Sequence, residues 1–117
     1  MKTHVMRLQP SPMKFMREGK KSIELRLYDE KRKQISVGDR IVFVNTEDET
    51  DLFRVTVLDL FVFSSFDELY KKLPLNECGY TEETVHAASP DDMGRYYSKE
   101  QQLMYGVVGI KICPDLS

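Results

Sequence analysis

The sequence predicts an α+β fold that is mainly β: a small, mostly antiparallel β-barrel with a short early helix and a helical insertion before the last strand. About five segments carry the β-branched and aromatic residues typical of strands, and turn signals separate them. Apart from a short early helix, helical signals gather in one block, residues 65–102, instead of alternating with the strands, which argues against a doubly wound parallel sheet. The length of 117 residues fits a single domain, residues 1–117.

The first residues predict a strand, a turn and a short helix, in that order. Residues 3–8 alternate in part between apolar and polar side chains. Prolines then break the strand, and we expect Ser11 to cap the helix with Pro12 as its first residue. Gly19 is expected to end the helix. Its apolar face would consist of Met13, Phe15 and Met16.

The stretch Gly19–Arg26 combines strand alternation with a row of polar side chains. Ser22, Glu24 and Arg26 alternate with apolar residues, so they share one face of a strand. Such a face can hold an anionic or polar ligand, and it can equally be an ordinary solvated surface.

Later segments predict the remaining strands. Ile41–Val44 is strongly β-prone, and the polar residues 45–51 after it predict a hairpin loop. Leu52–Phe63 changes the parity of its apolar positions midway, which predicts a bulge or bend. Tyr105–Ile112 is the closing strand, and we expect it to lie beside an early strand, which would remove free sheet edges.

The insertion predicts several short helical pieces. Ser65 and Glu68 form a capping-box pattern at the start of the first piece. Residues 81–86 are expected to begin a second helix, with Thr81 as its cap. Residues 89–93 and 98–102 are helical in character as well.

Composition excludes several classes of protein and site. No apolar run is long enough to span a membrane and the N-terminus lacks a signal-peptide core, so we expect a cytoplasmic protein with no membrane partner. Cys78 and Cys113 are expected to be free thiols. Two cysteines and two histidines without paired spacing do not provide a zinc site, so we expect no metal and no cofactor.

Charge is unevenly distributed along the chain. The net charge of −2 does not mark a nucleic-acid-binding protein. Residues 1–40 nevertheless hold eleven Lys and Arg against five Asp and Glu, whereas residues 45–100 are acid-rich. The basic first third can therefore form a local positive patch on an acidic protein.

Gly19, Lys21, Glu24 and Arg26 match the pattern Gly-x-Lys-x-x-Glu-x-Arg, and through it the chain resembles the ASCH domain family, a relative of the PUA RNA-binding domains. The early strand, the proline-led helix and the later Gly-Asp turn agree, so the resemblance spans nearly the whole chain. It implies a PUA-like barrel with a cleft between barrel and early helix, lined by the signature. It also implies RNA or a nucleotide as partner, and some members are enzymes.

One bacterial branch of that family removes the acetyl group of N4-acetylcytidine and resembles this chain in the Gly-x-Lys stretch. The branch uses a Lys, a Thr and a Glu, and Lys21 matches its Lys. Glu24 occupies the position of its Thr, which departs from that mechanism. Glu77 and Glu82 both lie in the region of its Glu.

The chemistry of the signature residues suits an anionic or nucleobase ligand. Lys21 can bind a phosphate or a carbonyl oxygen, and Arg26 offers a planar fork to a phosphate or a base edge. Glu24 can accept from an exocyclic amine or act as an acid or base, and the alternative is a structural ion pair with Arg26. Further ligand contacts are expected from Gly19, Ser22, Arg7, Ser11 and Lys14.

Aromatic side chains and the early helix extend these candidates. Tyr28, Tyr96 and Tyr97 can stack on bases, or they can cover the core with their hydroxyls in water. Ser11 and Lys14 lie where the helix N-terminus offers backbone N–H groups to an anion, although Ser11 can be a cap and nothing more.

Three functions remain open at this point. The first is binding of RNA or a nucleotide in the cleft. The second is hydrolysis in the same cleft, by an amidohydrolase acting on a modified nucleoside such as N4-acetylcytidine or by a ribonuclease, with Lys21 and Glu24 as catalytic residues. The third is a module that binds a small anion or a protein.

Overall fold

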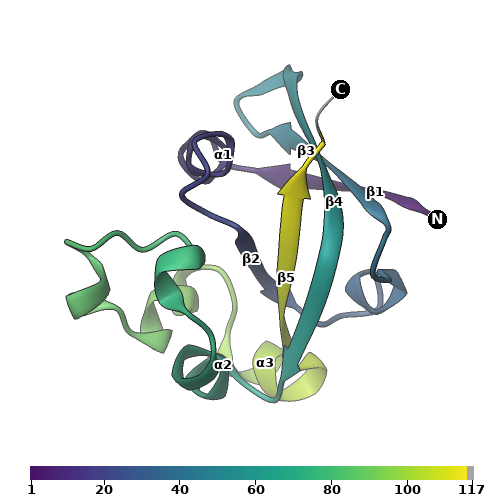
Figure 1. Ribbon diagram of the computed structural model, residues 1–117. Helices are drawn as coiled ribbons and strands as arrows, with labels where there is room; N and C mark the ends of the chain where they lie inside the picture. Colours follow the sequence, from purple (N-terminus) through teal and green to yellow (C-terminus); the bar gives the residue numbers. More distant parts are fainter. Residues whose placement is uncertain (116–117) are drawn as a thin grey trace.

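The computed structural model describes residues 1–115, which form a curled sheet flanked by short helices (Figure 1). The strands are β1 (Thr3–Leu8), β2 (Ile23–Leu27), β3 (Arg40–Asn45), β4 (Asp48–Phe63) and β5 (Val107–Pro114). The helices are α1 (Pro10–Arg17), α2 (Phe66–Lys72) and α3 (Lys99–Tyr105), with 3-10 turns η1 (Arg32–Gln34), η2 (Leu75–Glu77), η3 (Val85–Ala87) and η4 (Pro90–Arg95). Within residues 1–115, no helix has the length and apolar character needed to cross a bilayer.

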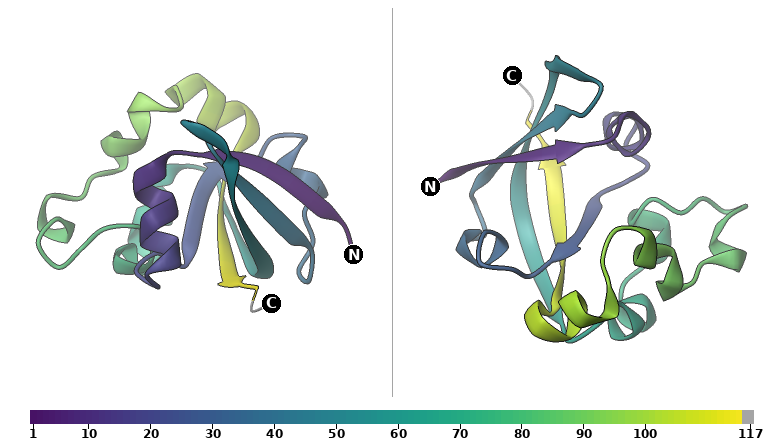
Figure 2. Two further views of the ribbon diagram at one scale, coloured as in Figure 1. Left: turned by 90° about the horizontal axis from the view of Figure 1, so that it is seen from above. Right: turned by 180° about the vertical axis from the view of Figure 1, so that it is seen from behind.

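The strands form one sheet in the order β1-β3-β4-β5-β2, in which β1 and β3 are parallel and the other neighbours are antiparallel. The sheet curls into a half-barrel (Figure 2), which confirms the predicted mainly β, α+β fold. β5 lies beside β2 as expected, and a register shift between Val57 and Asp59 confirms the bulge in β4. In the described chain β1 and β2 do not pair, so the expected removal of free edges is incomplete and a seam stays open between them.

α1 begins earlier than the sequence predicts. Gln9 is its N-cap residue and Pro10 its first helical residue, so the expectation that Ser11 caps the helix is wrong. Proline favours the first helical position because no N–H bond is lost there and its φ is already helical. The end of the helix is as predicted, since Gly19 follows the last turn with a φ of +76°.

The connection between β3 and β4 is shorter than the loop predicted at residues 45–51. Asn45 pairs with Asp48, so β4 begins at Asp48. The Asn45 side-chain oxygen accepts a hydrogen bond from the backbone N–H of Glu47 at 2.8 Å. Residues 45–51, which the sequence predicted as a loop, therefore form an Asx-type turn and the start of an exposed strand.

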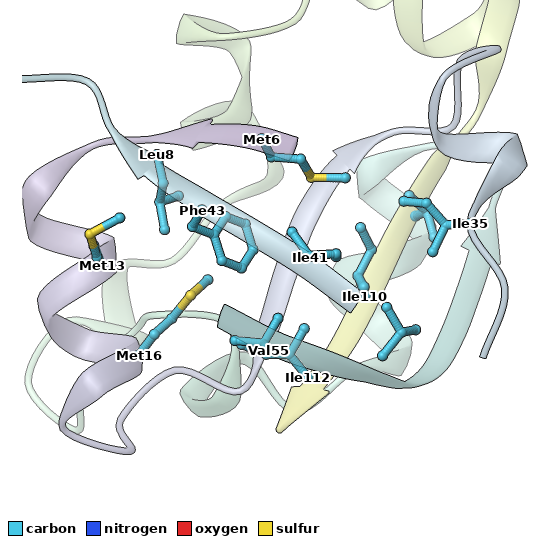
Figure 3. Close-up of a cluster of buried hydrophobic side chains, with 12 residues drawn as sticks. Met6, Leu8, Met13, Met16, Ile35, Ile41, Phe43, Val55, Ile110 and Ile112 are labelled. Atoms are coloured by element: carbon cyan, nitrogen blue, oxygen red, sulfur yellow. The ribbon is translucent and has the colours of Figure 1, made fainter. Parts of the chain in front are cut away.

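Two clusters of buried apolar side chains hold these elements together. The first joins α1 to β1, β3, β4 and β5 (Figure 3), with Met16 of the helix and Phe43 of the sheet both fully buried. The second joins β2 and the start of β5 to α2, through residues such as Leu25 and Phe66. β2 is thus fixed by apolar contacts to the insertion as well as by its pairing with β5.

The insertion, residues 64–106, leaves and re-enters the sheet at one place, because Phe63 pairs with Val107. Ser65 caps α2 as predicted, since its side chain accepts from the backbone N–H of Glu68 at 3.3 Å. The Glu68 carboxylate accepts instead from Ser64 Oγ at 2.8 Å, so the capping box is not closed.

The helix expected from Thr81 to His86 is wrong. The segment contains only the 3-10 turn η3, Val85–Ala87. Thr81 and Thr84 bond to each other's backbone N–H through their hydroxyl oxygens, at 3.1 and 2.8 Å. These local bonds compete with helical ones, which is the reason threonine favours caps and turns over helix interiors.

Candidate functional site

β2 is buried on both faces, because the insertion lies along it (Figure 1). Glu24, on the polar face of the strand, is only 4% exposed. The alternative of an ordinary solvated face is therefore wrong. A carboxylate buried to this degree requires partners that replace its water.

Glu24 has a cationic partner on each oxygen. Its Oε1 lies 3.0 Å from Lys21 Nζ. Its Oε2 accepts a hydrogen bond from Arg26 Nε at 2.9 Å and lies 2.8 Å from Arg26 Nη2. The ion pair between Glu24 and Arg26 that the sequence left as an alternative is thus present, and Lys21 extends it to a triad.

These partners decide the ionisation of the triad. Burial alone would raise the pKa of Glu24, but the charges of Lys21 and Arg26 outweigh it and lower that pKa to about 2. For Arg26, burial works toward a lower pKa, and the negative charge of Glu24 raises it above its ordinary value. Glu24 is therefore a carboxylate and Arg26 a cation throughout the physiological pH range.

Arg26 also spans the open seam of the half-barrel. Its Nη2 donates a hydrogen bond to the backbone oxygen of Arg7 in β1 at 2.7 Å. One guanidinium therefore joins the two edge strands that do not pair through their backbones. The same bond fixes the direction of Arg26 beside the triad.

A cavity of about 310 Å³ lies at this seam, and we call it the seam cavity. Its wall comes from the end of β1, the start of α1, the signature stretch with β2, and the insertion. Arg7, Lys21 and Arg26 contribute positive charge to the wall and Glu24 contributes negative charge. Three cations against one carboxylate leave the cavity net positive, which suits an anionic ligand.

Tyrosines of the insertion form another part of the wall. Tyr70, Tyr96 and Tyr97 of the insertion line the seam cavity, whereas Tyr28 lies outside its lining. Tyr97 stacks on Phe66 with ring centroids 5.9 Å apart, so its ring is held in place from behind. The cavity thus combines a charged side with an aromatic side.

Several of the predicted site residues lie elsewhere. Ser11, Lys14 and Gly19 are exposed and outside the lining of the seam cavity. Ser22 donates to Glu77 Oε1 at 2.8 Å, so it attaches the insertion to the start of β2. Of the predicted ligand contacts, the structure brings together Arg7, Lys21, Glu24 and Arg26.

Neither glutamate proposed for the enzymatic branch lies in the wall. Glu77 is occupied by Ser22 and by Lys111 Nζ at 3.8 Å, and Glu82 is exposed. The position that would carry the branch's Thr holds Glu24, whose oxygens are both paired.

Sequence reasoning missed Tyr70 and Cys78 as wall residues. Burial raises the pKa of the Cys78 thiol to about 11, and Cys78 and Cys113 are both free, as predicted. The available signal was composition, because five of the six tyrosines fall within residues 64–106. Position along the chain could not show which of them faces the signature strand.

Comparisons with known proteins agree with this architecture. The ASCH domain family model matches residues 6–114, which confirms the resemblance. The crystal structure of hypothetical protein PH0355 is 36% identical, with a TM-score of 0.77 over 98% of this chain and 100% of that one. The solution structure of protein PF0455 from Pyrococcus furiosus is 34% identical, with a TM-score of 0.72 over 96% of both chains.

A more distant structure shares the fold alone. ASCH from Zymomonas mobilis is 15% identical, with a TM-score of 0.62 over 96% of this chain and 69% of that one. No curated protein matches the chain.

Proposed function

The chain belongs to the ASCH domain family, a family of PUA-like fold suggested to bind RNA, and from this premise we propose that it binds RNA or a single nucleotide in the seam cavity. The observation that carries the proposal is the pairing of a cationic side, Lys21 and Arg26, with an aromatic side, Tyr96 and Tyr97, in one wall. Nucleotides offer the matching pair of features, a phosphate and a flat base.

We assign a part of the nucleotide to each group of wall residues. Arg7 is more than half exposed and lies 3.5 Å from the exposed Glu49, a surface pair that a phosphate can replace while it remains in water. Tyr97 is held by Phe66 and is suited to stack on a base. A volume of about 310 Å³ is at the small end for ligand pockets, which fits one nucleotide of a single strand better than a duplex.

Hydrolysis of a modified nucleoside or of RNA in the same cavity is the second candidate. The ammonium of Lys21 lies in the wall, where it can stabilise negative charge on an oxygen. A general base is also needed, and a carboxylate whose pKa is about 2 is a weak one. Ionisation of Glu24 therefore favours binding over hydrolysis.

Titration with short single-stranded RNA and with the common nucleoside 5′-monophosphates tests the proposal. Lys21→Ala should weaken the binding of the best ligand by about tenfold or more, because a charged hydrogen bond is lost. Lys20→Ala is the matched control, since Lys20 is the neighbouring lysine, is exposed, and lies outside the cavity. It should change the affinity less than about twofold.

Each outcome separates the candidates. Failure of every RNA and nucleotide to bind, or equal effects of the two lysine substitutions, would contradict the proposal. Product formation from N4-acetylcytidine or RNA that Lys21→Ala abolishes would establish the hydrolase instead.

A further inference from the structure

A row of hydrogen-bonded hydroxyl groups within the insertion ends at Tyr70, a residue of the cavity wall. Tyr80 Oη donates to Asp92 Oδ2 at 2.6 Å, and Tyr70 Oη lies 2.7 Å from Tyr80 Oη. Tyr70 lines the seam cavity, whereas Tyr80 and Asp92 do not. We call Asp92, Tyr80 and Tyr70 the relay, because they connect a carboxylate outside the cavity to a side chain in its wall.

The number of hydroxyl protons in the relay determines which group donates and which accepts in each of its hydrogen bonds. Hydrogen bonds from Tyr80 and from the Ser89 backbone N–H lower the pKa of Asp92, so its carboxylate only accepts. Tyr80 has one hydroxyl proton and donates it to Asp92, so its oxygen must accept from Tyr70. Tyr70 then has no proton left, and its oxygen can only accept a hydrogen bond from a ligand.

Burial keeps the phenols of Tyr70 and Tyr80 protonated. It raises the pKa of Tyr80, with the neighbouring Asp92 acting in the same direction, and it raises the pKa of Tyr70 as well. Neither phenol ionises near neutral pH. Lys21 and Arg26, which also line the seam cavity, are donors only.

We propose that Tyr70 determines base specificity in the seam cavity by accepting a hydrogen bond from an exocyclic amino group, while Lys21 and Arg26 donate to acceptors of the same ligand. This inference rests on the nucleotide-binding function proposed above. Cytosine and adenine carry an amino group at C4 or C6 beside a ring-nitrogen acceptor, whereas uracil and guanine carry a carbonyl oxygen at the same position. Tyr70 thus selects bases with a 4-amino or 6-amino group, and Tyr80 and Asp92 act as positioning residues.

Matched ligand pairs test the inference. Cytidine and adenosine 5′-monophosphates are compared with the 5′-monophosphates of 2-pyrimidinone riboside and purine riboside, which lack only the amino group. For at least one pair, the wild-type protein should bind the amino-bearing nucleotide about tenfold more tightly, because the analogue leaves Tyr70 unpaired.

Two substitutions locate the effect. Tyr70→Phe should reduce that ratio to about one, since the acceptor is removed with little change in volume. Tyr80→Phe should also reduce the ratio and should improve binding of uridine 5′-monophosphate, because Tyr70 regains a proton that it can donate. Tyr28→Phe, outside the cavity, is the matched control and should retain the wild-type ratio.

The outcomes separate this inference from the function on which it rests. A wild-type ratio near one with nucleotides still bound, or a ratio that persists in Tyr70→Phe, overturns the role of Tyr70 alone. Absence of binding by every nucleotide overturns the nucleotide-binding function and the inference together. Thermal unfolding of each variant shows whether it folds, and the Tyr80→Phe result decides the matter if Tyr70→Phe does not fold.

Discussion

Glu24, which the sequence predicts to contact a ligand, also stabilises the fold. It is a buried carboxylate whose two oxygens face Lys21 and Arg26. Its pKa is lowered from an ordinary 4.5 to about 2, so folding favours the ionised form. A pKa lowered by folding contributes stability that is full above the ordinary pKa and is lost as pH falls toward the folded pKa.

We therefore expect the free energy of unfolding to decrease as the pH is lowered from 5 to 2. The contribution of Glu24 over this range is about 3 kcal/mol, at roughly 1.4 kcal/mol for each unit of pKa shift. Urea denaturation of the wild type and of Glu24→Gln at both pH values measures it. Glu24→Gln should be less stable at pH 5 and should lose less stability on acidification.

Asp39 should leave some acid sensitivity in Glu24→Gln. A hydrogen bond with His4 at 2.9 Å, followed by bonds from the backbone N–H groups of Lys2 and Ser36, lowers its pKa as well. An equal loss of stability on acidification in the wild type and Glu24→Gln would contradict the assignment to Glu24.

At the scale of elements, the docking of the insertion depends on the absence of a side chain in β5. A Cβ at Gly109 would lie 2.7 Å from Leu73 Cδ1 and 3.2 Å from Ile23 Cγ2. Leu73 follows α2, and α2 carries Tyr70. The glycine thus sets the distance between the sheet and the helix that forms part of the cavity wall.

Gly109→Ala should destabilise the protein by about 1–3 kcal/mol, the range for overpacking. We also expect weaker nucleotide binding, because the end of the Leu73 side chain, directly after α2, must move to admit the methyl group. Gly94→Ala is the control, since a Cβ there has no neighbour within 4 Å among the described residues. Chemical denaturation and ligand titration measure the stability and the affinity of both variants. Equal losses in Gly109→Ala and Gly94→Ala would contradict this account.

At the scale of the whole molecule, charge is segregated. The chain carries a net charge of −2, yet the seam cavity presents Arg7, Lys21 and Arg26 against Glu24. The cavity is therefore the place where we expect a phosphate to be attracted to a protein of net negative charge.

Binding of single-stranded RNA should therefore depend on salt only moderately. Three cations less one carboxylate correspond to about two phosphate contacts, which gives a slope of log K against log salt of about −1.4. Affinities measured across a salt series test this value. A slope several times steeper would show that RNA follows a long basic surface outside the cavity.

Patterns that depend on near neighbours in sequence predicted most of the fold. The half-barrel strands, the Ser65 cap, the Gly19 helix end and the β4 bulge all follow from local alternation or turn chemistry. The predicted start of α1 was wrong because Pro10 and Pro12 both suit the first helical position, and the helix begins at Pro10. The Thr81 helix was wrong because hydroxyl bonds of two threonines replaced helical ones.

The candidate site was predictable on its strand side and not on its insertion side. Lys21, Glu24 and Arg26 lie in one short pattern, so their common location follows from strand periodicity. Tyr70, Tyr80 and Asp92 come from three separate pieces of the insertion. Their meeting depends on how those pieces pack, and no spacing in the sequence encodes it.

The pairing of Phe63 with Val107 has a consequence for how such proteins can diversify. The insertion, which supplies the tyrosines of the cavity wall, enters and leaves the sheet at one pair of residues, whereas Glu24 and Arg26 belong to the sheet itself. Changing the length of a loop between two paired residues costs little, about 0.6 kcal/mol for each doubling. One scaffold could therefore exchange residues 64–106 as a cassette and acquire a new ligand preference with its charged triad intact.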